Sequence, residues 1–220
     1  MASHNDPVLV IGLGRFGESL ALQLVESGTE VMAVDSRPEV VQRLSGQISA
    51  VVSADTTDLD ALREIGAQGF ARAVVAIGND QQSSILTTAN LAELEIEHIW
   101  AKALNRQHAR ILTRVGAHHV VLPEHDMGER VAHLVSGRML DYVEIDVDWA
   151  IGRTYPPKDL VGRRLGDSRL RVKHGVTVVS VKKEATSEFR HADADTVLSY
   201  GDEILVAGPI RSVERFADGL

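Results

Sequence analysis

The sequence predicts an α/β protein, with a Rossmann-like doubly wound parallel sheet followed by a small α+β domain. Between residues 8 and 122, short apolar runs alternate with amphipathic stretches, which is the pattern of repeated βαβ units. A glycine-rich turn directly follows the first apolar run and opens the first amphipathic stretch. Such a turn between a strand and a helix is typical of doubly wound sheets.

Six parallel strands are expected in the first domain. Because parallel strands need crossover connections, helices should cover both faces of their sheet. Gly28 should follow the end of the first helix, and Ser36 with Glu39 should form a capping box at the start of the second. The strands are expected at Val8–Ile11, Val31–Val34, Ala50–Ser53, Ala73–Ile77, Ile99–Ala103 and Val120–Leu122.

The pattern changes after the sixth strand. Pro123-Glu124 predicts a turn, and His125 or Asp126 could cap a helix over Met127–Leu140. We place a domain boundary near the end of that helix, which divides the chain into residues 1–140 and 141–220.

The second domain should be small and α+β. A lobe of this size buries a modest fraction of its surface, so we expect it to pack against another subunit. Its predicted elements are strands at Val143–Val147, Val176–Lys182 and Glu203–Ala207, a Tyr200-Gly201-Asp202 turn and a helix at Ile210–Phe216.

Composition excludes several classes of protein. The chain has no cysteine, so neither a disulfide framework nor a thiolate metal site can form. No run approaches the ~20 consecutive apolar residues needed to span a bilayer, and the residues before Val8 lack the pattern of a secretion signal. The 23 Lys and Arg residues are scattered in a chain of net charge −8, which argues against nucleic acid as a partner. We therefore expect a cytoplasmic protein that meets a membrane only through a partner.

The glycine-rich turn predicts a nucleotide site. It reads Gly12-Leu13-Gly14-Arg15-Phe16-Gly17. Gly12 permits the tight turn, Gly14 lets the backbone approach a pyrophosphate, and Gly17 lets helix and strand pack closely. The N–H groups at the start of the following helix can then bind anionic oxygens.

An acidic residue at the end of the second strand strengthens this interpretation. Asp35 lies 23 residues beyond Gly12, where a carboxylate is expected to bind ribose hydroxyls. Ser36 and Arg37 follow it directly and belong to the same candidate site. The negative charge of Asp35 should repel a 2′-phosphate and so disfavours NADP, although Arg37 keeps that ligand open.

Further candidate residues follow the other strands. Ligands of doubly wound sheets bind outside the carboxyl ends of the strands, so residues there can line the same pocket. A solvated loop position explains each of them equally well when it is taken alone. These candidates are Asp55 and Thr56 after the third strand, Ile77, Gly78 and Asn79 after the fourth, Lys102 at the end of the fifth and Glu124 after the sixth.

The sequence favours a sensor over an enzyme. A dehydrogenase needs a general acid or base and a domain that holds substrate against the nicotinamide, and the second domain is too small for that role. The nine histidines show no metal-ligand spacing, and we expect them on the surface. Arg15 can reach phosphate oxygens as a clamp, so we expect a phosphate sensor without catalytic residues. The alternatives are an NAD-dependent oxidoreductase and the sensor domain of another cation channel or exchanger.

Motifs across nearly the whole chain resemble one family, the cytosolic regulatory subunits of Ktr- and Trk-type potassium transporters, which are built from the RCK (or KTN) domain. In the first domain the resemblance rests on Val10–Gly17, Ala33–Asp35, Ala76–Gly78, Leu86–Thr88, Ile99–Ala103 and Pro123–Gly128. In the second it rests on Leu160–Gly162, Arg171–Val176 and Gly201–Glu203.

This resemblance implies a function and an assembly. It implies a homodimer that forms an octameric ring, binds ATP, ADP or NAD(H), and gates a potassium-conducting membrane subunit. Arg15 resembles the arginine that contacts nucleotide phosphates in the adjacent subunit, and Asp35 resembles the ribose-binding acid. Glu124 resembles an acid that joins Mg²⁺ or Ca²⁺ in some members. Several members bind cyclic di-AMP through the second domain, but Lys182–Asp195 lacks the prolines common there, so that ligand stays open.

Overall fold

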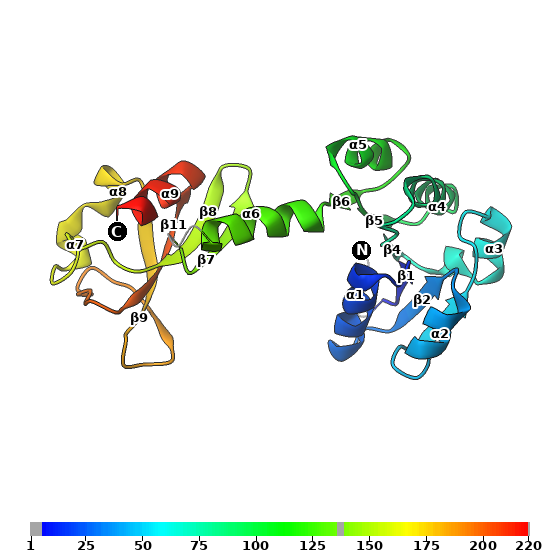
Figure 1. Cartoon of the computed structure of the whole chain (residues 1–220), viewed down its shortest axis with the longest axis horizontal. Helices are drawn as coiled ribbons and strands as arrows, with labels where there is room; N and C mark the ends of the chain where they lie inside the picture. Colours follow the sequence, from blue (N-terminus) through cyan, green and yellow to red (C-terminus); the bar gives the residue numbers. More distant parts are fainter. Residues whose placement is uncertain (1–5, 136–138, 220) are drawn as a thin grey trace. The chain divides into compact units, whose positions relative to one another are not determined.

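The computed structural model describes residues 6–135 and 139–219 (Figure 1). Contacts between residues divide the chain into two compact units, with the division between His125 and Asp126. The domain boundary expected near residue 140 stays a prediction.

The first unit contains the expected parallel sheet. Its strand order is β3-β2-β1-β4-β5-β6, and every neighbouring pair is parallel, which confirms the doubly wound fold class. The central strand is buried along its whole length because helices cover both faces. The strands are β1 (Val8–Ile11), β2 (Val31–Asp35), β3 (Ala50–Ser53), β4 (Arg72–Val75), β5 (His98–Lys102) and β6 (His119–Val121).

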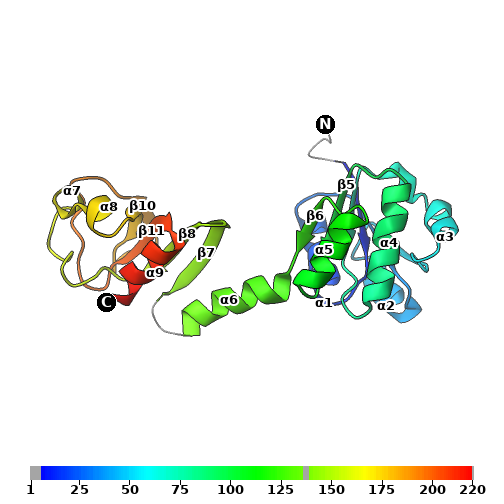
Figure 2. The same cartoon turned by 90° about the horizontal axis from the view of Figure 1, so that it is seen from above.

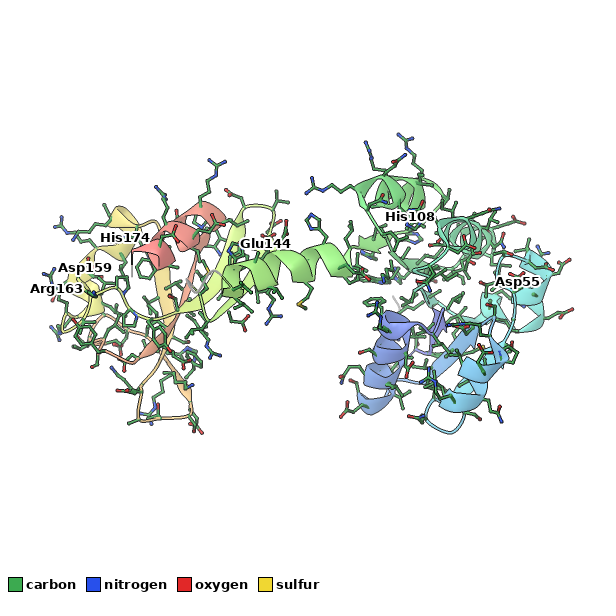
Figure 3. The ribbon with its side chains drawn as sticks, in the orientation of Figure 1. Asp55, His108, Glu144, Asp159, Arg163 and His174 are labelled. Atoms are coloured by element: carbon green, nitrogen blue, oxygen red, sulfur yellow. The ribbon has the colours of Figure 1, made fainter. Side chains whose placement is uncertain are left out.

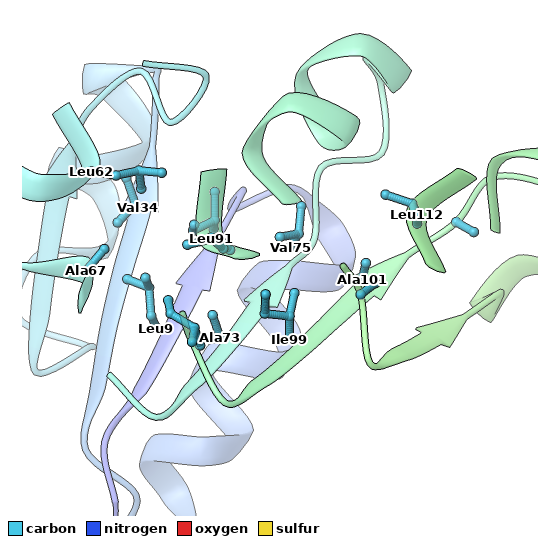
Figure 4. Packing of buried hydrophobic residues seen from close by; sticks show 14 residues of the cluster. Leu9, Val34, Leu62, Ala67, Ala73, Val75, Leu91, Ile99, Ala101 and Leu112 are labelled. Carbon is cyan, nitrogen blue, oxygen red and sulfur yellow. The ribbon is translucent and has the colours of Figure 1, made fainter. Parts of the chain in front are cut away.

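Two hydrophobic clusters hold the helices to opposite faces of this sheet. Val8 and Val10 of β1 belong to a cluster with residues of α1 and α2. Leu9 and Ile11 belong to a second cluster, drawn in Figure 4, with residues of α3, α4 and α5, whose ribbons are labelled in Figure 2. This division follows from the two-residue period of a strand. The helices are α1 (Arg15–Glu26), α2 (Pro38–Leu44), α3 (Leu59–Glu64), the 3-10 turn η1 (Ala67–Gly69), α4 (Gln81–Glu93) and α5 (Arg106–Arg114).

Of two predictions about helix ends, one is confirmed and the other is wrong. Gly28 follows α1 with a positive φ of 82°, and its N–H donates to the Val25 carbonyl at 2.9 Å, which confirms its role at the helix end. The capping box is wrong, because Arg37 and not Ser36 is the N-cap of α2. Pro38 explains this start: its fixed φ suits the first helical position, and it holds the preceding residue in an extended conformation.

Helix α6 (Pro123–Val135) begins at the proline for which the sequence predicted a turn. The predicted start at Met127 is therefore wrong, since a proline in the first helical turn needs no backbone hydrogen bond. Leu140, predicted as the last helical residue, lies outside any helix, and residues 136–138 of that prediction lie outside the described residues.

The second unit contains a five-stranded antiparallel sheet in the order β10-β9-β11-β8-β7. The three predicted strands and the final helix are confirmed as β7, β9, β11 and α9. The sequence missed β8 and the short β10. The alternation of β8 is obscured by Gly152; a Cβ there would lie 2.8 Å from a methyl group of Val213 in α9. The elements are β7 (Asp141–Asp146), β8 (Trp149–Thr154), α7 (Leu165–Ser168), α8 (Leu170–Lys173), β9 (Thr177–Lys182), β10 (Phe189–His191), β11 (Glu203–Pro209) and α9 (Ile210–Asp218).

Replacement of Gly17 by alanine should destabilise the first unit. A Cβ at Gly17 would lie 1.9 Å from the Gly12 carbonyl oxygen, so α1 must move away from β1, at a cost of about 1–3 kcal/mol or more. Gly14→Ala is the matched control: a Cβ there meets nothing within 4 Å, and we expect it to cost less than about 1 kcal/mol. Urea denaturation measures both, and equal losses would contradict this account of the glycine loop.

Candidate nucleotide-binding site

The site lies where the direction of the sheet connections changes. Strands β1 and β4 are neighbours, and the chain leaves β1 for a helix on one face and β4 for a helix on the other. The loops after these strands therefore diverge at the carboxyl edge of the sheet, which is where such folds bind ligands. The residues predicted from the sequence all follow strands at this edge.

The glycine loop has the geometry that a phosphate group requires. Gly12 has a φ of 91°, and its N–H donates to the Val34 carbonyl at 2.7 Å. A Cβ at Gly12 would lie 3.0 Å from the Ile77 nitrogen, so the loop packs directly on the end of β4. Gly14 differs, because the space beside it is open and it gives α1 no side-chain cap. The start of α1 thus presents backbone N–H groups and the positive end of the helix dipole beside an accessible backbone.

Asp35 is buried at the end of β2 and is bound on both of its carboxylate oxygens. Oδ2 accepts from the Leu13 N–H at 2.7 Å and from Arg37 Nη2 at 3.0 Å. Oδ1 accepts from the Arg37 N–H at 3.0 Å and from Arg37 Nε at 2.9 Å. Burial alone would raise the pKa of Asp35, but the hydrogen bonds from Arg37 and Leu13 outweigh it and hold the pKa below the ordinary value. The carboxylate is therefore ionised beside the glycine loop, whereas Ser36 next to it is exposed.

Lys102, Glu124, Phe16 and Gly78 lie together at the ends of β4, β5 and β6. The Nζ atom of Lys102 is 2.5 Å from Glu124 Oε1 and 5.6 Å from the centre of the Phe16 ring. A Cβ at Gly78 would lie 3.1 Å from the same Nζ, so the glycine leaves room for the lysine. The hydrogen bond from Lys102 lowers the pKa of Glu124, and the positive charge of Arg15 acts in the same direction.

The residues after β3 have a different role from the others. Asp55 is exposed in the loop that leads to α3 (Figure 3), and its Oδ1 accepts from the Thr57 N–H at 3.0 Å and from the Thr57 hydroxyl at 2.7 Å. Thr56 is buried, and its hydroxyl is 2.8 Å from that of Thr87 on α4. These contacts order the loop between β3 and α3. Among the described residues, no hydrogen bond joins Asp55 or Thr56 to the glycine loop.

Sequence reasoning missed two features near the site. Asp80 caps α4 by accepting from the Gln82 and Ser83 N–H groups, and a signal was present, since an aspartate directly precedes that helix. The hydroxyl of Ser83 also donates to Asp80, and hydrogen bonds from Ser83 lower its pKa. His108 is buried, which corrects the expectation of surface histidines; its Nδ1 accepts from the Leu104 N–H at 3.3 Å, and burial lowers its pKa (Figure 3).

The described residues contain no cluster of three or more His, Cys, Asp or Glu side chains that could hold a metal ion. Glu124, the candidate ligand, has a side chain that is 66% exposed. One exposed carboxylate fits a Mg²⁺ ion whose other ligands are phosphate oxygens and water, but it does not form a protein cage. Within the same described ranges, no helix is both long and apolar enough to cross a membrane.

Comparison with protein families settles the relationship. The TrkA-N domain matches residues 8–123, and the TrkA-C domain matches residues 153–219. The chain belongs to the TrkA-N/TrkA-C family. This confirms the resemblance to the RCK-domain regulatory subunits of Ktr and Trk potassium transporters.

Curated relatives of this TrkA-N/TrkA-C protein are named for potassium uptake. The Ktr system potassium uptake protein C of Bacillus subtilis is 38% identical over 208 residues, which are 94% of this chain and 94% of the relative. The Ktr system potassium uptake protein A of Vibrio alginolyticus is 34% identical over 210 residues, 95% of each chain.

Solved structures support the fold. The crystal structure of the GsuK RCK domain matches with a TM-score of 0.54 and 21% identity, and the match covers 100% of this chain and 47% of that chain. The GsuK channel bound to NAD matches with a TM-score of 0.53 and 21% identity, over 100% of this chain and 39% of that chain. This chain therefore spans less than half the length of those structures.

Proposed function

We propose that this TrkA-N/TrkA-C protein is a nucleotide-sensing subunit that gates potassium uptake through a membrane partner. One observation carries the proposal: the Leu13 N–H donates to the ionised Asp35 carboxylate at 2.7 Å, so the acid that we propose to bind ribose lies directly beside an open glycine loop. A ligand that fits both must join a ribose to phosphate groups. ATP, ADP and NAD(H) have that chemistry, and one relative in fold, the GsuK channel, is described as bound to NAD.

The charges at the two ends of the site support a ligand that joins a ribose to phosphate groups. Asp35 puts negative charge where ribose hydroxyls would donate hydrogen bonds. The start of α1 and the exposed Arg15 put positive charge where phosphates would lie. Lys102 adds a further cation, which is 7% exposed and is paired with Glu124. Potassium uptake relatives and this polarity favour sensing over hydride transfer, so we propose no catalytic residue.

Gating requires an assembly and a partner. We propose that the chain forms a homodimer and an octameric ring at the inner face of the membrane, held there by a potassium-transporting subunit of the Ktr or Trk type. A ligand can shift such a ring between two states only by binding one state more tightly. Arg15 is exposed and can reach the phosphates of a nucleotide held by an adjacent subunit, so it is the residue that we propose to sense the terminal phosphate.

The second unit offers a separate cavity. Its volume is about 470 Å³, and its lining includes Tyr155, Lys182 and Lys183. Lys182 is bound to Glu203 at 3.2 Å and Lys183 to Asp202 at 2.7 Å, so an anion there would have to compete with both carboxylates. Cyclic di-AMP is the ligand to test at this cavity, alongside the nucleotides of the first unit.

Asp35→Ala should weaken the binding of ATP, ADP and NADH alike, because all three share the ribose that this carboxylate would hold. We expect a loss of about tenfold or more, the size of one or two hydrogen bonds to a charged group. Calorimetric titration of the purified protein measures it, with cyclic di-AMP titrated in parallel and particle size followed by light scattering. Unchanged binding in the variant would show that the ribose assignment is wrong; NADH binding alone, to a small dimer, would favour the oxidoreductase.

Arg15→Ala should narrow the difference in affinity between ATP and ADP. The two ligands differ only in the terminal phosphate, which we propose that this guanidinium contacts. Arg43→Ala is a matched control, since Arg43 is also an exposed arginine but is paired with Glu18 on α1. Titration of both nucleotides to both variants makes the comparison, and an equal loss of ATP and ADP affinity in Arg15→Ala would eliminate the clamp.

Glu124→Gln should abolish any increase in ATP affinity that Mg²⁺ or Ca²⁺ provides. The amide keeps the shape of the side chain and removes the charge that a hard cation prefers. Titration of ATP with and without each cation, to the wild type and the variant, measures the effect. A cation effect of the same size in both proteins would exclude Glu124 as a ligand.

A further inference from the structure

The hydrogen-bonding positions of Asp35 are fully occupied by the protein itself. An ionised carboxylate offers about four lone-pair positions, two on each oxygen. Here Oδ1 accepts two hydrogen bonds, both from Arg37, and Oδ2 accepts one from Leu13 and one from Arg37. In this conformation Asp35 has no position left for a ribose hydroxyl.

The four donors differ in how easily they can leave. Two are the backbone N–H groups of Leu13 and Arg37, which belong to the loops that follow β1 and β2. The other two are Nε and Nη2 of the Arg37 guanidinium, whose side chain is 49% exposed. Rotation of that side chain towards water would free one position on each oxygen without moving the backbone. Two adjacent positions on the two oxygens match the vicinal 2′- and 3′-hydroxyls of a ribose.

We propose that Arg37 is a latch on the ribose position: it binds Asp35 in the nucleotide-free protein and must swing out to admit a ribose with both hydroxyls free. This inference rests on the proposed nucleotide site. A latch has a physical reason, because a buried carboxylate with unfilled hydrogen-bonding positions is costly, and the Arg37 guanidinium fills the two that the backbone leaves open until the ligand does. The guanidinium also lowers the pKa of Asp35, so the carboxylate is ionised when the ribose arrives.

The latch makes two predictions about affinity. The latch is a half-exposed bidentate ion pair, so its displacement should weaken nucleotide binding by up to about fivefold. It should also narrow the preference for ribose over deoxyribose, because only a ligand with both hydroxyls has to displace Arg37 in order to bind Asp35. Arg37 would thus set the threshold for all ribonucleotides and would take no part in distinguishing ATP from ADP.

Arg37→Ala should bind ATP and ADP about threefold to fivefold more tightly than the wild type, since the competing guanidinium is gone while the backbone N–H of residue 37 remains. The affinity for 2′,3′-dideoxy-ATP, which does not need the freed positions, should change less than about twofold. Arg37→Lys should fall between, because an ammonium group cannot bind both oxygens in the bidentate manner of a guanidinium. Arg43→Ala is the matched control, with a side chain of similar exposure (53%) that pairs with Glu18 instead.

Calorimetric titration of these four proteins tests the latch, with urea denaturation to confirm that each variant is folded. Tighter binding of ATP but not of dideoxy-ATP in Arg37→Ala, with Arg37→Lys in between and Arg43→Ala unchanged, supports it. Equal or weaker ATP binding in Arg37→Ala overturns it, because Arg37 would then be no competitor. Failure of the wild type and Arg37→Ala to bind any of ATP, ADP and NADH would overturn the proposed nucleotide site and the latch with it.

Discussion

The hydrogen bond between the Leu13 N–H and the Asp35 carboxylate joins the two halves of the candidate site. It is 2.7 Å long and buried, and next to it the Gly12 N–H donates to the Val34 carbonyl. The glycine loop is thereby fixed to the end of β2. The backbone therefore sets the distance between the proposed ribose position and the proposed phosphate position. Hydrogen bonds to a charged acceptor are stronger than those between neutral groups, so the same contact stabilises the loop and keeps Asp35 ionised.

Close packing at Gly17 fixes the position of the phosphate end of the candidate site. Its Cα faces the Gly12 carbonyl so closely that any side chain would push α1 away from β1. Because that contact is so close, the start of α1 lies directly at the carboxyl edge of the sheet, where its N–H groups and dipole can act on a phosphate. Helix packing and the proposed anion binding therefore depend on the same glycine motif, although on different glycines: Gly12 and Gly17 pack closely, and Gly14 leaves the backbone accessible.

Much of this arrangement could be predicted from the sequence, because it depends on short-range patterns. Apolar runs identified all six parallel strands, and the strand order then brought the loops after β1, β2, β5 and β6 to one edge. Strand β8 was not predicted because Gly152, which makes room for α9, has no side chain and so interrupts the alternation of apolar and polar residues.

Side-chain pairings were beyond sequence reasoning for a different reason. Thr56 pairs with Thr87, 31 residues away, and Arg37 turns back onto Asp35; both depend on rotamers that the surrounding fold selects. The sequence marked Arg37 as a residue that could accept a 2′-phosphate. The structure shows Arg37 bound to Asp35, the ribose-binding candidate, and the proposed latch is this contact.

A nucleotide sensor must bind its ligand and must distinguish ATP from ADP, and the charged residues proposed for these two tasks lie at opposite ends of the site. In the proposed site, Asp35 and its latch act at the ribose, which every candidate nucleotide shares, so they set how much nucleotide the protein needs before it responds. The roles that we propose for Arg15 and Glu124 lie at the phosphate end, where ATP and ADP differ. The affinity for all nucleotides and the discrimination between them would therefore rest on different residues at opposite ends of the ligand. Because the coupling to a gate depends only on the difference in affinity between states, a change at Arg37 would alter the threshold of the response without altering which nucleotide produces it.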